Sequence, residues 1–232
     1  MFFDGLMVVW CGKLRTLLRK ATMKIQTFVL GDYQTNSYCL MQTESAKDCL
    51  IIDTGLQSQP LINFLKENEL NPVAAVFTHG HIDHIDGLAL LRESWPDIKV
   101  AIHKDDAGMF DDDKQNLSAF SGMPFRADPA EIIIEAGWPL SFAGLEFNVL
   151  HTPGHTPGGI SLYSQQEGVV FVGDALFAGS IGRTDFPGGD FNQLIASIKT
   201  KLLTLPEDTK IYPGHGPATT IATEKRTNPF LM

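Results

Sequence analysis

Short apolar runs alternate with helical patterns along the chain from residue 23 onward. Apolar runs over 24–30, 37–41, 49–53, 73–77 and 100–103 predict strands, and similar runs follow over 131–134, 145–150, 159–164, 169–173 and 210–212. Helical spacing of apolar residues is found over 58–68, 85–95 and 190–203. Strands grouped in two halves, each with helices, predict an α/β fold: a four-layer αββα sandwich, with two sheets face to face and helices outside.

The first 22 residues differ from the rest of the chain. Four basic residues between positions 13 and 20 stand against the single acid Asp4, although the whole chain has a formal charge of −9. Such a basic segment is typical of an organelle-targeting leader or of a stretch upstream of the true start at Met23. Under both interpretations we expect one domain over 23–232, with 1–22 outside the fold.

Charge and cysteine content narrow the function classes. An acidic chain disfavours phosphate backbones, so we expect no nucleic-acid partner. No apolar run approaches the roughly 20 residues of a membrane span, so no membrane association is expected. The three cysteines form no C-x-x-C pair, which indicates reduced thiols and a cytoplasmic location.

The densest group of metal-binding side chains follows the predicted strand over 73–77, in the sequence THGHIDH from Thr78 to His84. His79 and His81 are two positions apart, so an extended backbone directs both rings the same way. Asp83 and His84 follow where the chain turns into a helix and can face a neighbouring point. One tetrahedral site rarely takes this many donors from one loop, so the motif predicts two metal ions.

Three later loops each add one donor directly after a predicted strand: His155, Asp174 and His215. Each lies next to a glycine, which lets the backbone approach a crowded site. A lone histidine is more often structural, but seven donors in this arrangement predict a metal site. We interpret His103 as structural and His151 as a support for the metal ligands.

The complete pattern resembles the metallo-β-lactamase-fold hydrolases. Within that family, TPGHTPG at 152–158, GDALF at 173–177, PGHGP at 213–217 and the tail at 224–231 are similar to the short, single-domain glyoxalase II (hydroxyacylglutathione hydrolase)-like enzymes. The resemblance covers the chain from about residue 23 to its end. It implies a metal-dependent hydrolase whose small-molecule substrate is a thioester of the S-acylglutathione type.

The resemblance also assigns roles to the donors. One divalent ion is held by His79, His81 and His155, the other by Asp83, His84 and His215, and Asp174 bridges them. Zinc is the expected metal, with iron or manganese as alternatives. The ions would lower the pKa of a shared water to give a metal-bound hydroxide, with Asp83 and Asp174 as the catalytic carboxylates. No general acid stands out in these motifs, which suits a thiol leaving group of pKa about 8.5.

Asp53, in IIDTG at 51–55, matches a family aspartate that orients the site, although a turn-forming aspartate before glycine has the same appearance.

Two departures from the full-length glyoxalase II pattern leave the identity of the substrate undecided. The chain has 17 residues after His215, so we expect the helical C-terminal domain of full-length glyoxalase II to be missing. Its glutathione-binding Lys and Tyr are replaced in GRTDF at 182–186, where we expect Arg183 to pair with a substrate carboxylate but Asp185 not to replace the Tyr.

The GRTDF stretch also resembles the persulfide dioxygenases of this fold, which use a single iron. A mononuclear iron persulfide dioxygenase is therefore one alternative, and a metal-dependent ester or phosphodiester hydrolase is another. The PGHGP ending favours the hydrolases, and a non-catalytic metal-binding protein is disfavoured because no ligand of the pattern is missing.

The leader is expected to be dispensable, because it contains no motif residue and its composition contrasts with the remaining chain. A chain that starts at Met23 should keep its circular dichroism spectrum, its metal content and its turnover. Loss of folding in the shortened chain would show that residues 1–22 belong to the domain.

Overall fold

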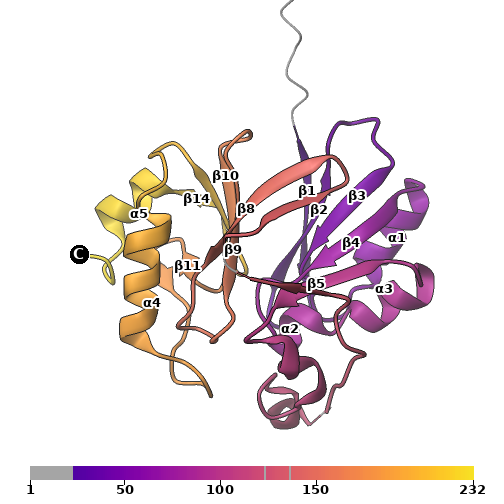
Figure 1. The fold of residues 1–232 in the computed structure, drawn as a ribbon, viewed down its shortest axis with the longest axis horizontal. Helices are drawn as coiled ribbons and strands as arrows, with labels where there is room; N and C mark the ends of the chain where they lie inside the picture. Colours follow the sequence, from indigo (N-terminus) through magenta and orange to yellow (C-terminus); the bar gives the residue numbers. More distant parts are fainter. Residues whose placement is uncertain (1–22, 123, 136) are drawn as a thin grey trace, which may run out of the picture.

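The structure is a computed structural model that describes residues 23–122, 124–135 and 137–232. The predicted leader, 1–22, lies outside these ranges. The strands form two large sheets that face each other, with helices on the outer side of each (Figure 1). The predicted four-layer αββα sandwich is confirmed.

The first sheet has six strands that follow one another in chain order. The first three strands are antiparallel, and the third to the sixth are parallel to each other. They are β1 (Lys24–Leu30), β2 (Thr35–Met41), β3 (Asp48–Ile52), β4 (Asn71–Val76), β5 (Lys99–His103) and β6 (Ile132–Ile134).

The second sheet also has six strands, in the order β14-β13-β10-β9-β8-β7. All neighbours are antiparallel except the parallel pair β10 and β13. The strands are β7 (Pro139–Phe142), β8 (Leu145–His151), β9 (Ile160–Ser164), β10 (Val169–Gly173), β13 (Lys210–Pro213) and β14 (Thr219–Thr220). A small separate hairpin pairs β11 (Leu176–Phe177) with β12 (Ser180–Ile181).

Helices cover the outer faces of both sheets. On the first sheet lie α1 (Gln59–Glu67) and α3 (Leu88–Ser94), and on the second lie α4 (Phe191–Ser197) and α5 (Ile221–Thr227) (Figure 1). The short α2 (Ile82–Ile85) lies below the first sheet in this view. Two 3-10 helices, η1 (Ala107–Asp111) and η2 (Ser118–Ser121), lie between β5 and β6 along the chain, and a π-helical turn, η3 (Ile198–Leu202), continues α4.

Alternation along the strands divides the buried side chains of the described residues into three clusters. In β3, Leu50 and Ile52 face the second sheet, whereas Cys49 and Ile51 pack against the outer helices. In β10, Phe171 belongs to the middle cluster, which lies between the two sheets, and Val170 belongs to the cluster between the second sheet and its outer helices. Successive side chains of a strand point to opposite faces, so each sheet is apolar on both faces and the sandwich has four layers.

Strand direction gathers the functional loops at one edge. The carboxyl ends of the parallel strands β3 and β4 lie at the same edge of the first sheet. In the second sheet, β10 and β13 are parallel, and β8 runs the same way because β9 is antiparallel to both β8 and β10. The residues that follow these five strands are therefore brought together.

Two predicted helices differ from the observed ones. The pattern over 85–95 predicts one helix, but the structure has α2 and α3 separated at Gly87. The Gly87 N–H donates to the Gly55 carbonyl at 3.0 Å, and a Cβ at this position would overlap Ser58, so close packing on the preceding loop interrupts the helix. The helix predicted over 190–203 is α-helical only to Ser197 and then π-helical.

Several short elements were not predicted: β7, β11, β12, β14, α5 and the two 3-10 helices. Three of the strands, β11, β12 and β14, have only two residues each, too few to show an apolar period. Among the residues that the structure describes, no helix is long and apolar enough to cross a lipid bilayer.

Phe171 should be a principal contributor to stability, because it is 1% exposed at the centre of the middle cluster. Its ring lies 5.0 Å from that of Tyr38 and 5.1 Å from that of Tyr212. Phe171→Ala is expected to lower the free energy of unfolding by about 3–5 kcal/mol in urea denaturation. The matched variant Phe191→Ala, at a ring on the surface of α4, should change it by less than about 0.5 kcal/mol, and equal losses would contradict this ranking.

Candidate metal centre

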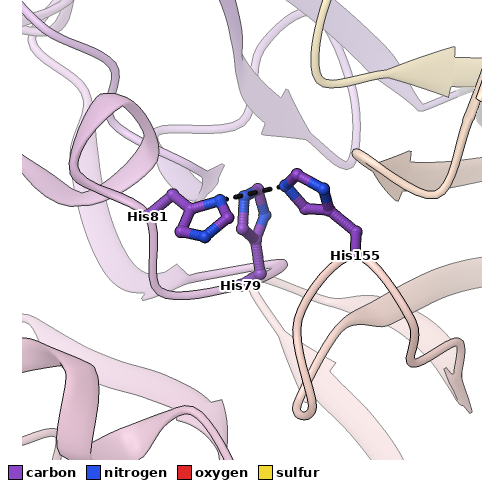
Figure 2. Close-up of side chains that lie close together, drawn as sticks. All are labelled: His79, His81 and His155. Atoms are coloured by element: carbon purple, nitrogen blue, oxygen red, sulfur yellow. Dashed lines mark hydrogen bonds between the residues drawn. The ribbon is translucent and has the colours of Figure 1, made fainter. Parts of the chain in front are cut away.

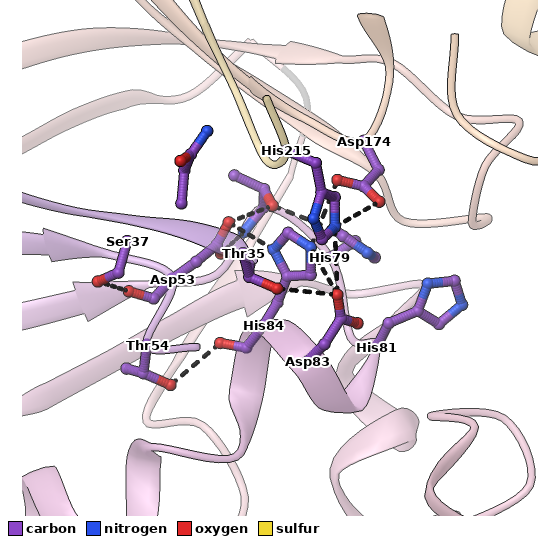
Figure 3. Close-up of polar contacts among 12 residues, drawn as sticks. Thr35, Ser37, Asp53, Thr54, His79, His81, Asp83, His84, Asp174 and His215 are labelled. Carbon is purple, nitrogen blue, oxygen red and sulfur yellow. Dashed lines mark hydrogen bonds and ion pairs between the residues drawn. The ribbon is translucent and has the colours of Figure 1, made fainter. Parts of the chain in front are cut away.

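All seven predicted donors meet at the shared edge of the two sheets. His79 and His81 follow β4, and Asp83 and His84 lie on α2. The second sheet supplies the remainder from the loops after β8, β10 and β13: His155, Asp174 and His215. Figure 3 shows the side chains of Asp83, His84, Asp174 and His215 converging from both sheets.

The first group of donors is a triad of histidines. His79, His81 and His155 present nitrogen atoms that all lie within 4.8 Å of one another. His81 Nδ1 and His155 Nε2 are 2.9 Å apart, and the ring of His79 lies 4.8 Å from that of His81 and 4.9 Å from that of His155 (Figure 2). Three imidazole nitrogens at this spacing fit one divalent ion.

The second group combines a carboxylate with two imidazoles. Asp83 Oδ2 lies 3.2 Å from His215 Nε2 and 3.6 Å from His84 Nε2. The hydroxyl of Thr35 donates to the same Asp83 oxygen at 3.1 Å (Figure 3). This arrangement provides a second set of three ligands next to the histidine triad.

Asp174 lies between the two groups. Its Oδ1 is 3.4 Å from His84 Nε2, and its Oδ2 is 3.5 Å from His155 Nε2 and 3.4 Å from His215 Nε2. A Cβ at Gly214 would overlap the Asp174 carboxylate, which explains the glycine before His215. The carboxylate reaches both groups, as the predicted bridge requires.

Hydrogen bonding shows that these donors fit metal ions. Within the described ranges, four buried polar atoms have no hydrogen-bond partner at the centre of the cluster: His79 Nε2, His81 Nε2, His84 Nε2 and Asp174 Oδ1. Buried polar atoms are rarely left without a partner, because desolvating them is costly. Nitrogen and oxygen atoms that converge in this way are the donor set of a divalent transition metal.

Burial keeps two rings of the histidine triad, His79 and His81, neutral. It lowers the pKa of His81 to about 3, and the neighbouring ring of His155 adds to the effect. It also lowers the pKa of His79 well below the ordinary value, with His84 as the next largest cause. Neutral imidazole is the form that binds a metal, so these rings are ready to act as ligands.

The second group has the opposite electrostatic character. Burial alone would lower the pKa of His84, but nearby carboxylates, Asp83 foremost, raise it well above the ordinary value. Burial also opposes the shift at His215, where hydrogen bonds to Asp174 and Asp83 raise the pKa to about 10. Burial disfavours the charged form of Asp174, yet His84 and the other rings hold its pKa well below the ordinary range. Protons on His84 and His215 thus balance the carboxylates, and a divalent ion would replace them.

Asp53 supports the site and also shapes the backbone. Its Oδ2 lies 2.8 Å from His84 Nδ1 (Figure 3). The same oxygen accepts from the Thr78 hydroxyl at 2.8 Å, and Oδ1 accepts from the Thr78 N–H at 2.8 Å. Asp53 is 1% exposed and has a φ of 54°, so it is also a turn residue before Gly55. The carboxylate fixes the His84 ring so that Nε2 faces the other donors.

Backbone carbonyls orient two further rings. His155 Nδ1 donates to the Arg183 carbonyl at 2.6 Å, and His215 Nδ1 donates to the Tyr33 carbonyl at 2.9 Å. These contacts direct Nε2 of each ring toward the donor cluster. Sequence reasoning did not identify them, because any residue type supplies a backbone carbonyl.

Asp106 is a buried residue that the sequence analysis missed. Its Oδ2 accepts from the Gly80 N–H at 3.1 Å and from the Thr156 hydroxyl at 2.7 Å, and its Oδ1 accepts from the Gly158 N–H at 2.6 Å. Burial raises its pKa against these hydrogen bonds. Gly80 separates His79 from His81, and Thr156 follows His155, so one carboxylate connects the loops that carry the histidine triad. Its only sequence signal was an acidic residue shortly after a strand.

The two remaining histidines form a separate pair. The rings of His103 and His151 stack at 4.2 Å with an interplanar angle of 17°. His151 Nε2 donates to the Pro157 carbonyl at 2.9 Å, in the loop that carries His155. The pair lies beside Asp105 but outside the seven-residue cluster.

The donor cluster opens into a pocket of about 370 Å³. His81, Asp83, His155, Asp174 and His215 contribute to its lining, together with six apolar or aromatic side chains and Arg183. The Arg183 guanidinium is bonded to Asp185 and lies 4.2 Å from the ring centroid of Phe186. Arg183 is therefore at the pocket, and its pairing with a substrate carboxylate stays a prediction.

Asp106→Asn should weaken metal binding by about 10- to 100-fold, because an amide cannot accept all three hydrogen bonds that hold the two ligand loops together. Competition with a chromogenic chelator measures this affinity, and circular dichroism checks the fold. The variant Asp111→Asn, at an exposed side chain of the same segment outside every group of possible metal ligands, is the matched control. Equal affinities in the two variants would show that Asp106 has no positioning role.

Two curated relatives match nearly the whole chain. A protein of Bacillus subtilis named "Probable metallo-hydrolase YqgX" is 40% identical over 210 residues, which are 90% of this chain and 98% of the relative. The hydroxyacylglutathione hydrolase GloC of Haemophilus influenzae is 39% identical over 212 residues, again 90% of this chain and 98% of the relative.

Three solved structures are also similar to nearly the whole chain. The BLEG-1 B3 metallo-beta-lactamase superposes with a TM-score of 0.86 at 41% identity, covering 90% of this chain and 100% of that one. A di-iron-bound form of TTHA1623 has a TM-score of 0.77 at 38% identity, with 89% and 100% covered. ETHE1 from Myxococcus xanthus has a TM-score of 0.71 at 31% identity, covering 89% of this chain and 83% of that one.

The family model of the metallo-beta-lactamase superfamily matches residues 30–215, a range that contains every donor described above. The chain belongs to that superfamily.

Proposed function

We propose that this metal-dependent hydrolase cleaves small-molecule thioesters of the S-acylglutathione type with two divalent ions. The observation that carries the proposal is the second group of donors. Asp83, His84 and His215 lie beside the histidine triad, and Asp174 contacts both groups. A protein that needs one metal has no use for a second complete set of ligands next to the first.

The ions would lower the pKa of a shared water and polarise the substrate carbonyl. The side chains of this chain would hold the ions and orient the attacking water and the ligand rings. Thr35 and His215 contact Asp83 Oδ2, so Oδ1 is the atom that we expect to accept a hydrogen bond from the attacking water. Asp53 keeps His84 Nε2 directed at the cluster, and the Arg183 carbonyl does the same for His155.

The leaving group favours a thioester over an amide. A thiol with a pKa of about 8.5 departs as thiolate without a proton donor, whereas an amine must be protonated. The similarity to GloC, at 39% identity over nearly full length, supports the hydroxyacylglutathione class. The similarity to BLEG-1 is a reason to test a β-lactam in parallel.

We propose zinc as the metal, because its tetrahedral sites take imidazole and carboxylate ligands. Iron remains the main alternative, since TTHA1623 has been solved in a di-iron-bound form. The similarity to ETHE1 and the GRTDF sequence at 182–186 favour a second candidate, the mononuclear iron persulfide dioxygenase. That candidate requires only one metal per chain and consumes oxygen.

Purified protein should contain close to two divalent ions per chain and hydrolyse S-lactoylglutathione without oxygen. His84→Ala should lower kcat by at least ~100-fold, because loss of the second ion removes a large electrostatic stabilisation. Elemental analysis of both proteins checks that the variant has lost about half of its metal. Phe191→Ala, at an exposed ring on α4 outside every group of possible metal ligands, is the control and should retain metal and activity.

The alternative has a distinct signature. One iron per chain, oxygen uptake with glutathione persulfide and no hydrolysis of thioesters would overturn the hydrolase proposal. Cleavage of a phosphodiester or of a chromogenic cephalosporin in preference to every thioester would keep the hydrolase but replace its substrate.

A further inference from the structure

Five side chains form an apolar wall around the pocket above the donors: Tyr33, Leu117, Phe120, Phe177 and Phe186. Phe120 is 75% exposed and Tyr33 is 57% exposed, which is unusual for aromatic rings that line the same cavity. Exposed apolar side chains that gather at a cavity indicate a binding surface, because a ligand removes their area from water.

The backbone holds Leu117 in a conformation that leucine seldom adopts. Its φ is 70°, in the left-handed region that is costly for a residue with a Cβ. The buried Asn116 fixes this turn: its side-chain amide donates to the Met109 carbonyl at 2.9 Å, and its side-chain oxygen accepts from the Ser118 N–H at 2.9 Å. Strain at a residue that lines a pocket indicates that its position there has a role.

The same segment is attached to the metal-binding motif. The Ile82 N–H donates to the Asn116 carbonyl at 2.8 Å, and Ile82 is adjacent to His81 and Asp83. Leu117 and Phe120 are therefore positioned relative to the donors and do not simply cover the surface.

The cation at the pocket is already neutralised. Arg183 Nε donates to Asp185 Oδ1 at 2.9 Å, and Nη2 donates to Asp185 Oδ2 at 2.7 Å. The guanidinium also lies 4.2 Å from the centroid of the Phe186 ring. Of the described residues that line the pocket, Arg183 is the only lysine or arginine, so the wall offers little net positive charge to an anion.

We propose that the apolar wall binds the acyl group of the substrate, that this group is uncharged and bulky, aromatic or branched, and that Asp185 disfavours anionic acyl groups by pairing with Arg183. The inference rests on the proposed thioesterase activity, because it assigns the acyl part of that substrate. An aromatic ring gains from burial against Leu117 and Phe120, whereas a carboxylate against the same wall loses hydration without an unpaired side-chain cation in return.

The metal-loaded enzyme tests this with three thioesters that share glutathione as the thiol. The kcat/KM for S-phenylacetylglutathione should exceed that for S-lactoylglutathione by about tenfold, which is the usual effect of burying a modest apolar group. S-succinylglutathione should be the poorest of the three. A preference for the lactoyl or succinyl thioester would overturn the inference.

Phe120→Ala should reduce the phenylacetyl-to-lactoyl ratio of kcat/KM by about fivefold, because it removes a ring from the wall. Trp138→Ala is the matched control, since Trp138 is 54% exposed and does not line the pocket. An unchanged ratio in Phe120→Ala, or an equal loss in Trp138→Ala, would contradict the role of the wall.

Asp185→Asn should raise kcat/KM for S-succinylglutathione by about fivefold relative to the lactoyl thioester, because one unpaired charge near 4 Å is worth about this factor in water. Asp185→Glu retains the negative charge and should not show this gain. Equal behaviour of the two variants would remove Asp185 as a specificity determinant.

Binding of uncleavable thioethers separates this inference from the proposed function. By calorimetry, S-benzylglutathione should bind the metal-loaded protein about tenfold more tightly than S-methylglutathione. If no thioester is hydrolysed but this difference is found, the proposed reaction is wrong and the apolar wall stands. If thioesters are hydrolysed and the two thioethers bind equally, the acyl-binding role of the apolar wall is wrong and the proposed reaction stands.

Discussion

The site depends on how the two sheets are held relative to each other, because each supplies part of every ligand group. Besides the aromatic packing around Phe171, hydrogen bonds cross between the sheets next to the donors. The Tyr38 hydroxyl and the Asn36 amide both donate to the Pro213 carbonyl, at 2.6 and 2.9 Å, and the Ile160 N–H donates to the Thr78 carbonyl at 2.9 Å. A shift between the sheets would have to break these buried hydrogen bonds, so the fold itself sets the spacing of the ligands.

The fixed spacing of the two sheets also keeps the buried charges of the cluster close enough to compensate one another. Two carboxylates and five imidazoles are desolvated in one place, which is stable only if opposite charges compensate one another. Without metal, protons on His84 and His215 supply that compensation, whereas burial keeps His79 and His81 neutral. Because His84 and His215 carry protons whereas His79 and His81 are neutral, the two donor groups differ chemically, and we expect them to bind metal with different affinities.

Sequence reasoning reached the sandwich and the seven donors because both leave local signals: alternating apolar strands, and polar residues directly after them. Asp53 was identified through the family resemblance of IIDTG at 51–55, because a turn-forming aspartate before glycine has the same local appearance. Asp106 and Asn36 were not, because their partners at Gly80, Thr156 and Pro213 are distant in sequence and only the fold brings them close. The break in the helix predicted over 85–95 had the same origin, since Gly87 packs against a preceding loop that the helical period does not report.

The direction of β1 has a practical consequence. Leu30 at its carboxyl end pairs with Thr35, near the donors, so Lys24 lies at the opposite edge of the sheet. The Met23 N–H donates to Glu167 at 3.2 Å, in the turn between β9 and β10 on that same distant edge. Attachment of the protein to a solid support through the amino-terminal side of residue 23 would therefore leave the pocket facing the solution, which suits an immobilised catalyst or a surface-based binding measurement.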